Sequence, residues 1–360
     1  MGFFARGGEP DDSEAKALER IEAGGIPESA EQRLRGLGRD GSLFTSGLSV
    51  KEFALLARLG PQPLAQVMGA SVVRTGWQYL PALDPAPVTI TRAMQRGLGP
   101  SVSGYTLNAG YTEPSPRQVS NYLWHATVVC ELDTLTDAWN LARRRALDRL
   151  AEEAIQVGAD AVVGVYLHRS EHDLARGTIE YVVSGTAIRL PDSDGAAWPL
   201  LSDASVQDYW RLRCAGHEPA GFVATTAVLF ASPARATRVA RARSLAQNQE
   251  LEELSRAFQA ARETIRAKLL GQVSGAHATG AVGVEFAHDV RRDKLPVASS
   301  LTGTGQRGWQ RGRLGIPYKV SGHSDFERSG WVITMHAAGT AVRPGPAPAP
   351  SPPVHPRIRL

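Results

Sequence analysis

The feature that most constrains the fold of this chain is an internal repeat. The block Ser49–Phe53 recurs as Ser205–Tyr209, and Gly60 recurs as Gly216, a constant offset of 216 − 60 = 156. A repeated block predicts a repeated structural unit, and in a chain of 360 residues it divides the molecule into two halves.

Two long predicted helices carry a second match. Six apolar residues fall at steps of three or four and form a stripe along one face of each helix. In the first helix they are Leu135, Trp139, Ala142, Ala146, Leu150 and Ala154; in the second they are Leu254, Phe258, Ala261, Ile265, Leu269 and Val273, at an offset of 254 − 135 = 119. We expect Thr134 and Asp137 to form a capping box and Gly158 to end the first helix.

Each helix leads into a predicted strand, at residues 161–165 and 281–284, and each half closes on a further strand, at 184–189 and 338–343. Glycine stands at matching places in these strands, as Gly164 and Gly283 and as Gly185 and Gly339. Glycine inside a strand indicates a bulge, a bend or the close approach of another backbone, so we interpret these four residues as structural.

The change in offset locates two insertions, at residues 77–134 in the first half and 288–329 in the second. The predicted domains are therefore a unit at 42–200 and a unit at 201–344. Before them, residues 1–41 are expected to form a helical hairpin and a linker. After them, residues 345–360 are Pro-rich and predict a disordered tail.

Three runs of the first half, 146–154, 158–165 and 184–188, resemble the YbjQ-like family of heavy-metal-binding domains. The resemblance extends to both halves, about 42–190 and 202–344, although the second is more diverged and has His277 in place of Gly158. It implies an α+β fold of two tandem β-α-β-β units, dodecin-like or YbjQ-like, each an antiparallel sheet packed on one long helix. It also implies closed, commonly pentameric rings and no established catalytic activity.

Elementary packing also favours self-association. One helix covers only one face of a small sheet, so apolar strands such as 162–167 need a second cover. We expect a homo-oligomeric ring, in which five chains would contribute ten units. The alternative is a monomer in which the two units cover each other.

The chemistry-bearing residues are sparse. His168 and His172 are the best candidate metal ligands, and they could hold a divalent ion if the chain folds back between them, although a solvated turn is the simpler interpretation. Cys130 and Cys214 are expected to be buried, reduced thiols. No nucleophile elbow and no phosphate-binding loop is present in the sequence, which predicts a protein without enzymatic activity and without a firmly implied cofactor.

Other partners have weaker support. Four arginines between Arg235 and Arg243 fall at helical spacing, and with Trp309 they could bind a polyanion, but a solvated face is favoured and nucleic acid is not an expected partner. No apolar run is long enough for a membrane span, and the first residues lack a secretory pattern, so a cytoplasmic location is expected.

The sequence thus predicts a non-enzymatic ring or scaffold that could enclose a ligand at unit interfaces. Two alternatives stay open. One is a heavy-metal-binding protein using His168 and His172, and the other is an adaptor that recruits a protein partner through its N-terminal hairpin or its Pro-rich tail.

Overall fold

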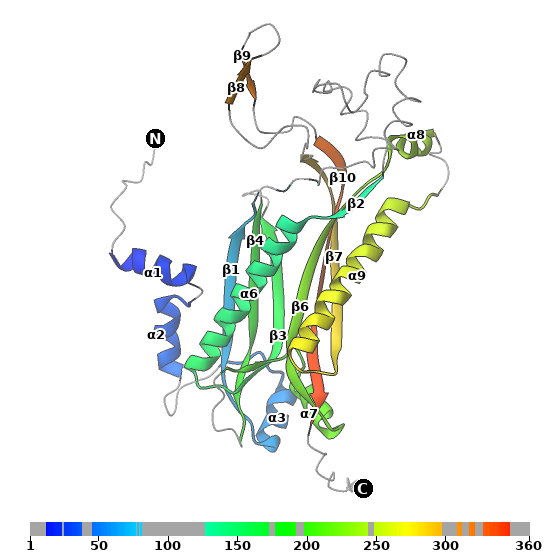
Figure 1. Cartoon of the computed structure of the whole chain (residues 1–360). Helices are drawn as coiled ribbons and strands as arrows, with labels where there is room; N and C mark the ends of the chain where they lie inside the picture. The colour runs from blue at the N-terminus through cyan, green and yellow to red at the C-terminus, as the bar shows by residue number, and fades with distance from the viewer. Residues whose placement is uncertain are drawn as a thin grey trace.

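Two four-stranded sheets, each with one long helix packed on it, make up the body of the computed structural model (Figure 1). The structure describes residues 12–23, 25–37, 45–76, 78, 80, 127–172, 177–191, 198–243, 248–296, 308–311, 317–320 and 327–345. The α+β class predicted from the sequence is confirmed. The predicted Pro-rich tail and most of the insertion at 77–134 lie outside the described residues.

The first sheet has the strand order β1-β4-β3-β5, in which β1, β4 and β3 are antiparallel and the short β5 is parallel to β3. The elements of this half are α1 (Asp12–Glu22), α2 (Glu28–Leu37), α3 (Val50–Leu59), β1 (Gln62–Arg74), β2 (Val128–Glu131), α6 (Asp133–Gln156), β3 (Ala161–His172), β4 (Thr178–Arg189) and β5 (Leu200–Leu201).

The second sheet has the order β2-β6-β10-β7, so β2 belongs to the first half in sequence but to the second sheet in space. The remaining elements are α7 (Val206–Cys214), β6 (His217–Ser232), α8 (Arg235–Arg243), α9 (Glu252–Gly275), β7 (Gly280–Pro296), β8 (Gly308–Arg311), β9 (Pro317–Val320) and β10 (Glu327–Pro344). None of the described helices is long and apolar enough to cross a membrane.

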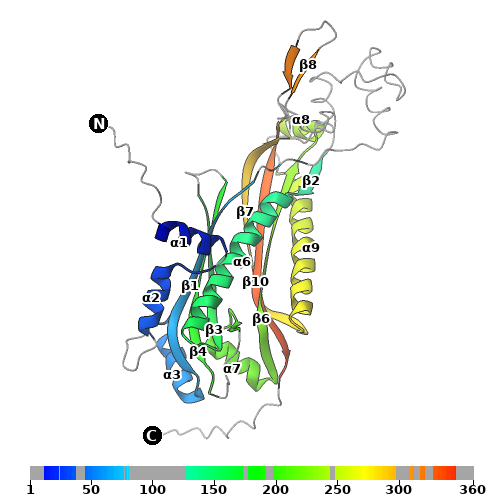
Figure 2. The same ribbon diagram turned by 60° about the vertical axis from the view of Figure 1, so that its left-hand side comes forward.

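Helix α6 lies between the two sheets (Figure 2). Ala142, Ala146 and Leu150 are fully buried against the first sheet, where the absence of a side chain at Gly69 in β1 lets the helix backbone approach closely. The opposite flank of α6 contacts β6 of the second sheet. Helix α9 packs in the same way on its own sheet, through Ala261 and Ile265, but its opposite flank is exposed.

The start of α6 corrects one prediction. The helix begins at Asp133 with Leu132 as its N-cap and without a side-chain cap, so the capping box of Thr134 and Asp137 does not form. The reason is that the chain enters the helix directly from β2, and the Leu132 N–H donates to the Val228 carbonyl of β6. A capping box does form at α3, between Ser49 and Glu52.

Two further differences concern boundaries. Each first strand is preceded by a short helix, α3 or α7, that the predicted β-α-β-β unit lacks; Ser49 and Ser205 cap these helices. The predicted insertion at 288–329 begins and ends inside strands, because β7 continues to Pro296 and β10 starts at Glu327.

A buried polar cluster joins the two sheets beside α6. The Nδ1 atom of His336 in β10 forms hydrogen bonds with the Thr226 hydroxyl at 2.9 Å and with the Tyr181 hydroxyl at 3.2 Å. The Trp139 ring stands edge-on to both the His336 and Tyr181 rings. Desolvation, followed by the positive charges of Arg169 and Arg143, lowers the pKa of His336 to about 3.

The close approach at Gly69 predicts a destabilising substitution. In Gly69→Ala the new Cβ would stand 2.7 Å from the Leu150 backbone nitrogen and closer still to the Ala146 carbonyl oxygen. We expect a loss of roughly 1–3 kcal/mol in the free energy of unfolding, measured by chemical denaturation. Gly271→Ala on α9, where nothing lies within 4 Å, is the control and should be neutral or stabilising. Equal effects of the two changes would contradict this packing.

The buried His336 predicts a pH dependence of stability. Its pKa in the folded chain, about 3, lies below the ordinary 6.5, so protons bind the unfolded chain preferentially. The contribution of the neutral His336 to the free energy of unfolding is complete above about pH 6.5 and is lost as the pH falls toward 3. Over this range the unfolding equilibrium constant rises by up to about tenfold per pH unit. His336→Gln should flatten this slope, whereas His217→Gln, at an exposed histidine, should leave it unchanged.

Candidate functional site: the strand edges at the junction of the two sheets

The outer edge of β6 is covered by residues of the first half. Residues Val128–Glu131 of β2 pair with Leu229–Ser232 of β6, and the Leu132 N–H continues the contact to the Val228 carbonyl at 2.7 Å. Strand β2 ends at Glu131, and from Val228 to Thr226 side chains of α6 bind the edge of β6 in its place.

The flank of α6 that faces β6 is polar. The Thr136 hydroxyl oxygen accepts from the Val228 N–H at 3.0 Å. The Asn140 amide accepts from the Thr226 N–H at 3.1 Å and donates to the Thr226 carbonyl at 2.9 Å. Arg143 is also buried here. A strand edge leaves unpaired backbone groups that are costly to bury, and this flank satisfies them.

The corresponding edge of the first sheet belongs to β1, which ends the strand order β1-β4-β3-β5. Two of its outward backbone groups have partners: the Met68 N–H donates to Glu153 at 2.9 Å, and the Ala70 carbonyl accepts from Arg149. Backbone groups of alternate residues point the same way, so Val72 also presents its N–H and carbonyl at this edge. In the described part of the chain no strand pairs there, and Val72 is 60% exposed.

A second contact links the halves at the edge of β3. The chain at residues 200–204 follows this edge, with the Ser202 N–H donating to the Val162 carbonyl and the Gly164 N–H donating to the Ala204 carbonyl. The Ser202 hydroxyl also lies 2.9 Å from the Thr340 hydroxyl of β10. The equivalent outer edge of the second sheet belongs to β7, which ends its strand order within the described residues.

Of the four glycines predicted to be structural, Gly164 and Gly283 lie at these edges, in β3 and β7, whereas Gly185 and Gly339 lie in the inner strands β4 and β10. Gly164 and Gly283 have positive φ, 62° and 65°, with no atom within 4 Å of a Cβ, so the backbone conformation and not a close neighbour requires glycine. The β3–β4 register shifts between Val163 and Tyr166. At Gly185 and Gly339 a Cβ would instead meet side-chain or backbone atoms of the neighbouring strand, which makes these two positions close approaches.

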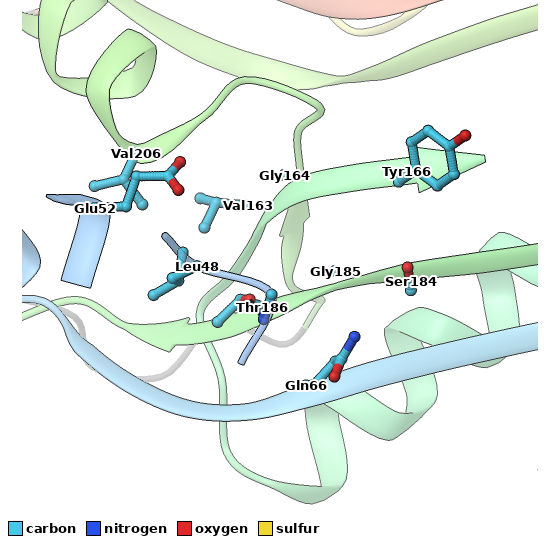
Figure 3. A pocket seen from close by; sticks show the side chains of 11 residues that line it. Leu48, Glu52, Gln66, Val163, Gly164, Tyr166, Ser184, Gly185, Thr186 and Val206 are labelled. Atoms are coloured by element: carbon cyan, nitrogen blue, oxygen red, sulfur yellow. Dashed lines mark hydrogen bonds between the residues drawn. The ribbon is translucent and has the colours of Figure 1, made fainter. Parts of the chain in front are cut away.

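A hollow of about 230 Å³ lies at the second contact, between β3, β4 and the start of α3 (Figure 3). Its polar lining includes Glu52, Gln66, Ser184 and Thr186, and Tyr166 stands at its side. These groups can form hydrogen bonds, and no histidine or cysteine is among the lining residues.

The two candidate metal ligands both lie in β3. An extended strand advances about 3.3 Å per residue, so the backbone positions of His168 and His172 are about 13 Å apart, and the chain does not fold back between them. No group of three histidine, cysteine or acidic side chains positioned for a metal ion is found among the described residues. Metal binding by this pair therefore stays a prediction from the sequence.

The remaining candidates form no site. Burial is the main cause that raises the pKa of the Cys130 thiol to about 11, which makes it a poor nucleophile. The predicted burial of Cys214 is wrong, because this residue ends the short helix α7 at the surface. In the arginine-rich helix α8, Arg241 forms an ion pair with the buried Glu253 at 2.5 Å. Trp309 lies in β8, apart from this helix in the chain.

Sequence reasoning missed the polar flank of α6. Thr136, Asn140 and Arg143 are spaced at three or four residues, like the apolar stripe beside them, and this second stripe was the available signal. It was overlooked because polar residues on a helix usually face water.

Comparisons with known proteins place these elements in a wider context. Residues 123–191 match the model of the YbjQ family, described as "Putative heavy-metal-binding". The chain is 28% identical over 276 residues to the Encapsulin nanocompartment protein Rv1762c of Mycobacterium tuberculosis, which covers 73% of this chain and 88% of that protein.

Shorter matches involve proteins named UPF0145. That of Halobacterium salinarum is 47% identical over 60 residues, and that of Methanoregula boonei is 39% identical over 71 residues. These matches cover 17% and 19% of this chain, and they span only 56% and 57% of the two relatives. No solved structure matches the chain. The chain therefore contains, at residues 123–191, a segment similar to the YbjQ family, and β2, α6, β3 and β4 lie within it.

Proposed function

We propose that this protein is a non-enzymatic, self-assembling scaffold built from two diverged copies of one unit, and that its copies associate head to tail into a closed ring. In this arrangement the second half of one chain contacts the first half of the next, in the way that the first half contacts the second within the chain. The name of the encapsulin nanocompartment relative also favours a role in a larger assembly.

The order of elements supports the duplication. Apart from β2, β5, α8, β8 and β9, which have no counterpart, the first half runs α3, β1, α6, β3, β4 and the second runs α7, β6, α9, β7, β10. The strand order β1-β4-β3 of one sheet corresponds to β6-β10-β7 of the other, and in sequence the long helix directly precedes β3 in the first half and β7 in the second. Two unrelated folds would have no reason to share both the sequence order and the spatial order.

Matched contacts support it further. Glu153 accepts from the Met68 N–H, and Gln272 accepts from the Ala224 N–H; the offsets are 272 − 153 = 119 and 224 − 68 = 156. Likewise, the Gly47 N–H donates to the Thr186 hydroxyl, and the residue 156 positions later donates to Thr340.

The observation that best supports self-assembly is that equivalent residues of the two halves differ in burial. Val228 is 1% exposed at the junction, whereas its counterpart Val72 on β1 is 60% exposed. Val206 is 2% exposed against the first sheet, whereas its counterpart Val50 is 86% exposed. Each exposed residue occupies a position that is buried in the other half.

The same mismatch occurs at the other end of the molecule. Leu270 on α9 and Val282 on β7 are exposed, whereas their counterparts Ala151 and Val163 are buried. The two ends are therefore complementary to each other in the way that the halves already are. Such a heterologous contact forms a ring if its rotation closes.

The duplication predicts that Glu153 can be replaced by glutamine. Glu153→Gln keeps the acceptor for the Met68 N–H, as Gln272 does for Ala224, and removes a buried carboxylate whose pKa is raised mainly by desolvation. It also removes the ion pair with the half-exposed Arg33, which offsets part of this gain. We expect a nearly unchanged free energy of unfolding, whereas Glu153→Ala should lose about 1 kcal/mol or more. Equal losses for the two variants in chemical denaturation would contradict the equivalence.

The assembly predicts a mass in solution that is a multiple of 38.6 kDa, measured by analytical ultracentrifugation at micromolar concentration. Val72→Asp places a charge on the open edge of β1 and should shift the protein toward the single chain without unfolding it. Val239→Asp on α8, an exposed valine away from both ends, is the control and should keep the native mass. A wild-type protein that sediments as one chain would overturn the proposal.

A further inference from the structure

The polar flank of α9 is the counterpart of the flank of α6 that covers β6. Adding 119 to Thr136 and Asn140 gives Ser255 and Gln259, which have the same hydroxyl and amide chemistry. Gln259 is exposed, and Ser255 is half-buried and donates to Glu250. The N-caps of the two helices also match: Leu132 has φ −102° and ψ 84°, and Leu251 has φ −89° and ψ 84°.

The open edge of β1 is the counterpart of the edge that the flank of α6 satisfies. Subtracting 156 from Thr226 and Val228 gives Ala70 and Val72, whose backbone groups point outward. The Ala70 carbonyl already accepts from Arg149, so the Val72 backbone and the Ala70 N–H are the groups of this edge that remain for a contact. These groups and the flank of α9 offer the two sides of a contact that the chain already makes internally.

Resting on the proposed function, we infer that α9 of one chain covers the β1 edge of the next. Ser255 accepts from the Val72 N–H, Gln259 pairs with the backbone of Ala70, and residues 248–250 pair with the end of β1 as β2 does with β6. Arg262 is left outside this pairing, because Ala70 has no hydroxyl where Thr226 offers one to Arg143.

Charge complementarity gives the contact a testable ion pair. Within the chain, Lys268 of α9 pairs with Glu131 of β2 at 2.8 Å. Their counterparts are Arg149, since 268 − 119 = 149, and Glu250, since 131 + 119 = 250. Glu250 is exposed and ends the segment 248–250, so in the assembly it reaches Arg149 of the next chain.

Arg149 is half-buried and can bind a further carboxylate. Its two terminal nitrogens donate to the carbonyls of Ala70 and Ile21, and each of these nitrogens carries a second N–H. Burial, followed by the charge of Arg145, lowers the pKa of Arg149, against the opposing effect of Glu152. A guanidinium offers five N–H donors, so it can bind Glu250 while keeping its present contacts.

The test is a charge-reversal cycle read by ultracentrifugation across a concentration series. Glu250→Arg should raise the concentration of half-dissociation about tenfold, as should Arg149→Glu. The double variant should return to within about threefold of the wild type. Glu252→Arg, an equal charge change two residues away on the exposed side of α9, is the control and should have no effect.

A second variant does not depend on Arg149, which also supports the N-terminal helices. Gln259→Leu removes the amide at a surface position, so it should weaken assembly severalfold with an unchanged unfolding midpoint. If the wild type assembles but Glu250→Arg behaves like Glu252→Arg and Gln259→Leu has no effect, this contact is wrong and the proposed scaffold stands. If the wild type does not assemble, the proposed function itself fails.

Discussion

The structure depends on one requirement, that the outward backbone groups of β6 find partners away from water. The free-energy cost of one buried amide without a hydrogen bond is a large fraction of the net stability of a whole domain, so the edge has to be covered. The chain solves this with two devices in sequence, a short strand and then the Thr136 and Asn140 side chains. Together they fix the position of α6 against the second sheet.

This requirement gives α6 two buried sides of different chemistry. One side is apolar and small, with Ala142 and Ala146 against the first sheet, and it allows the close approach at Gly69. The other side is polar and still buried. In this chain the second sheet covers the polar side. Helix α9 has a hydroxyl and an amide at the equivalent positions, Ser255 and Gln259, but within the described residues it packs on only one sheet.

The sequence predicted what depends on local periodicity and missed what depends on distant pairing. The helices at Leu135 and Leu254 were found because their apolar spacing is a property of the helix itself. The membership of β2 in the second sheet was not, because nothing in four residues specifies a partner about a hundred positions away. The expected capping box failed for the same reason: a long-range bond to Val228 positions the start of α6.

The metal prediction at His168 and His172 rested on a turn, and β3 continues through both residues because its pairing with β4 extends to Thr178. The polar stripe of Thr136, Asn140 and Arg143 was visible in the sequence, but its burial was not, because burial depends on the second sheet. What the repeat could indicate was the equivalence of positions. That equivalence became informative only when the burial of the two halves could be compared.

A chain that contributes two units constrains any ring it closes. In the proposed assembly every whole chain adds two units, so the number of units is even, and a single ring of five units cannot be built from intact chains. A ring of five chains would contain ten units and would need half the rotation per unit of a five-unit ring. Because packed sheets and helices tolerate little change in crossing geometry, the angle between the two sheets within one chain determines which even-numbered ring can close.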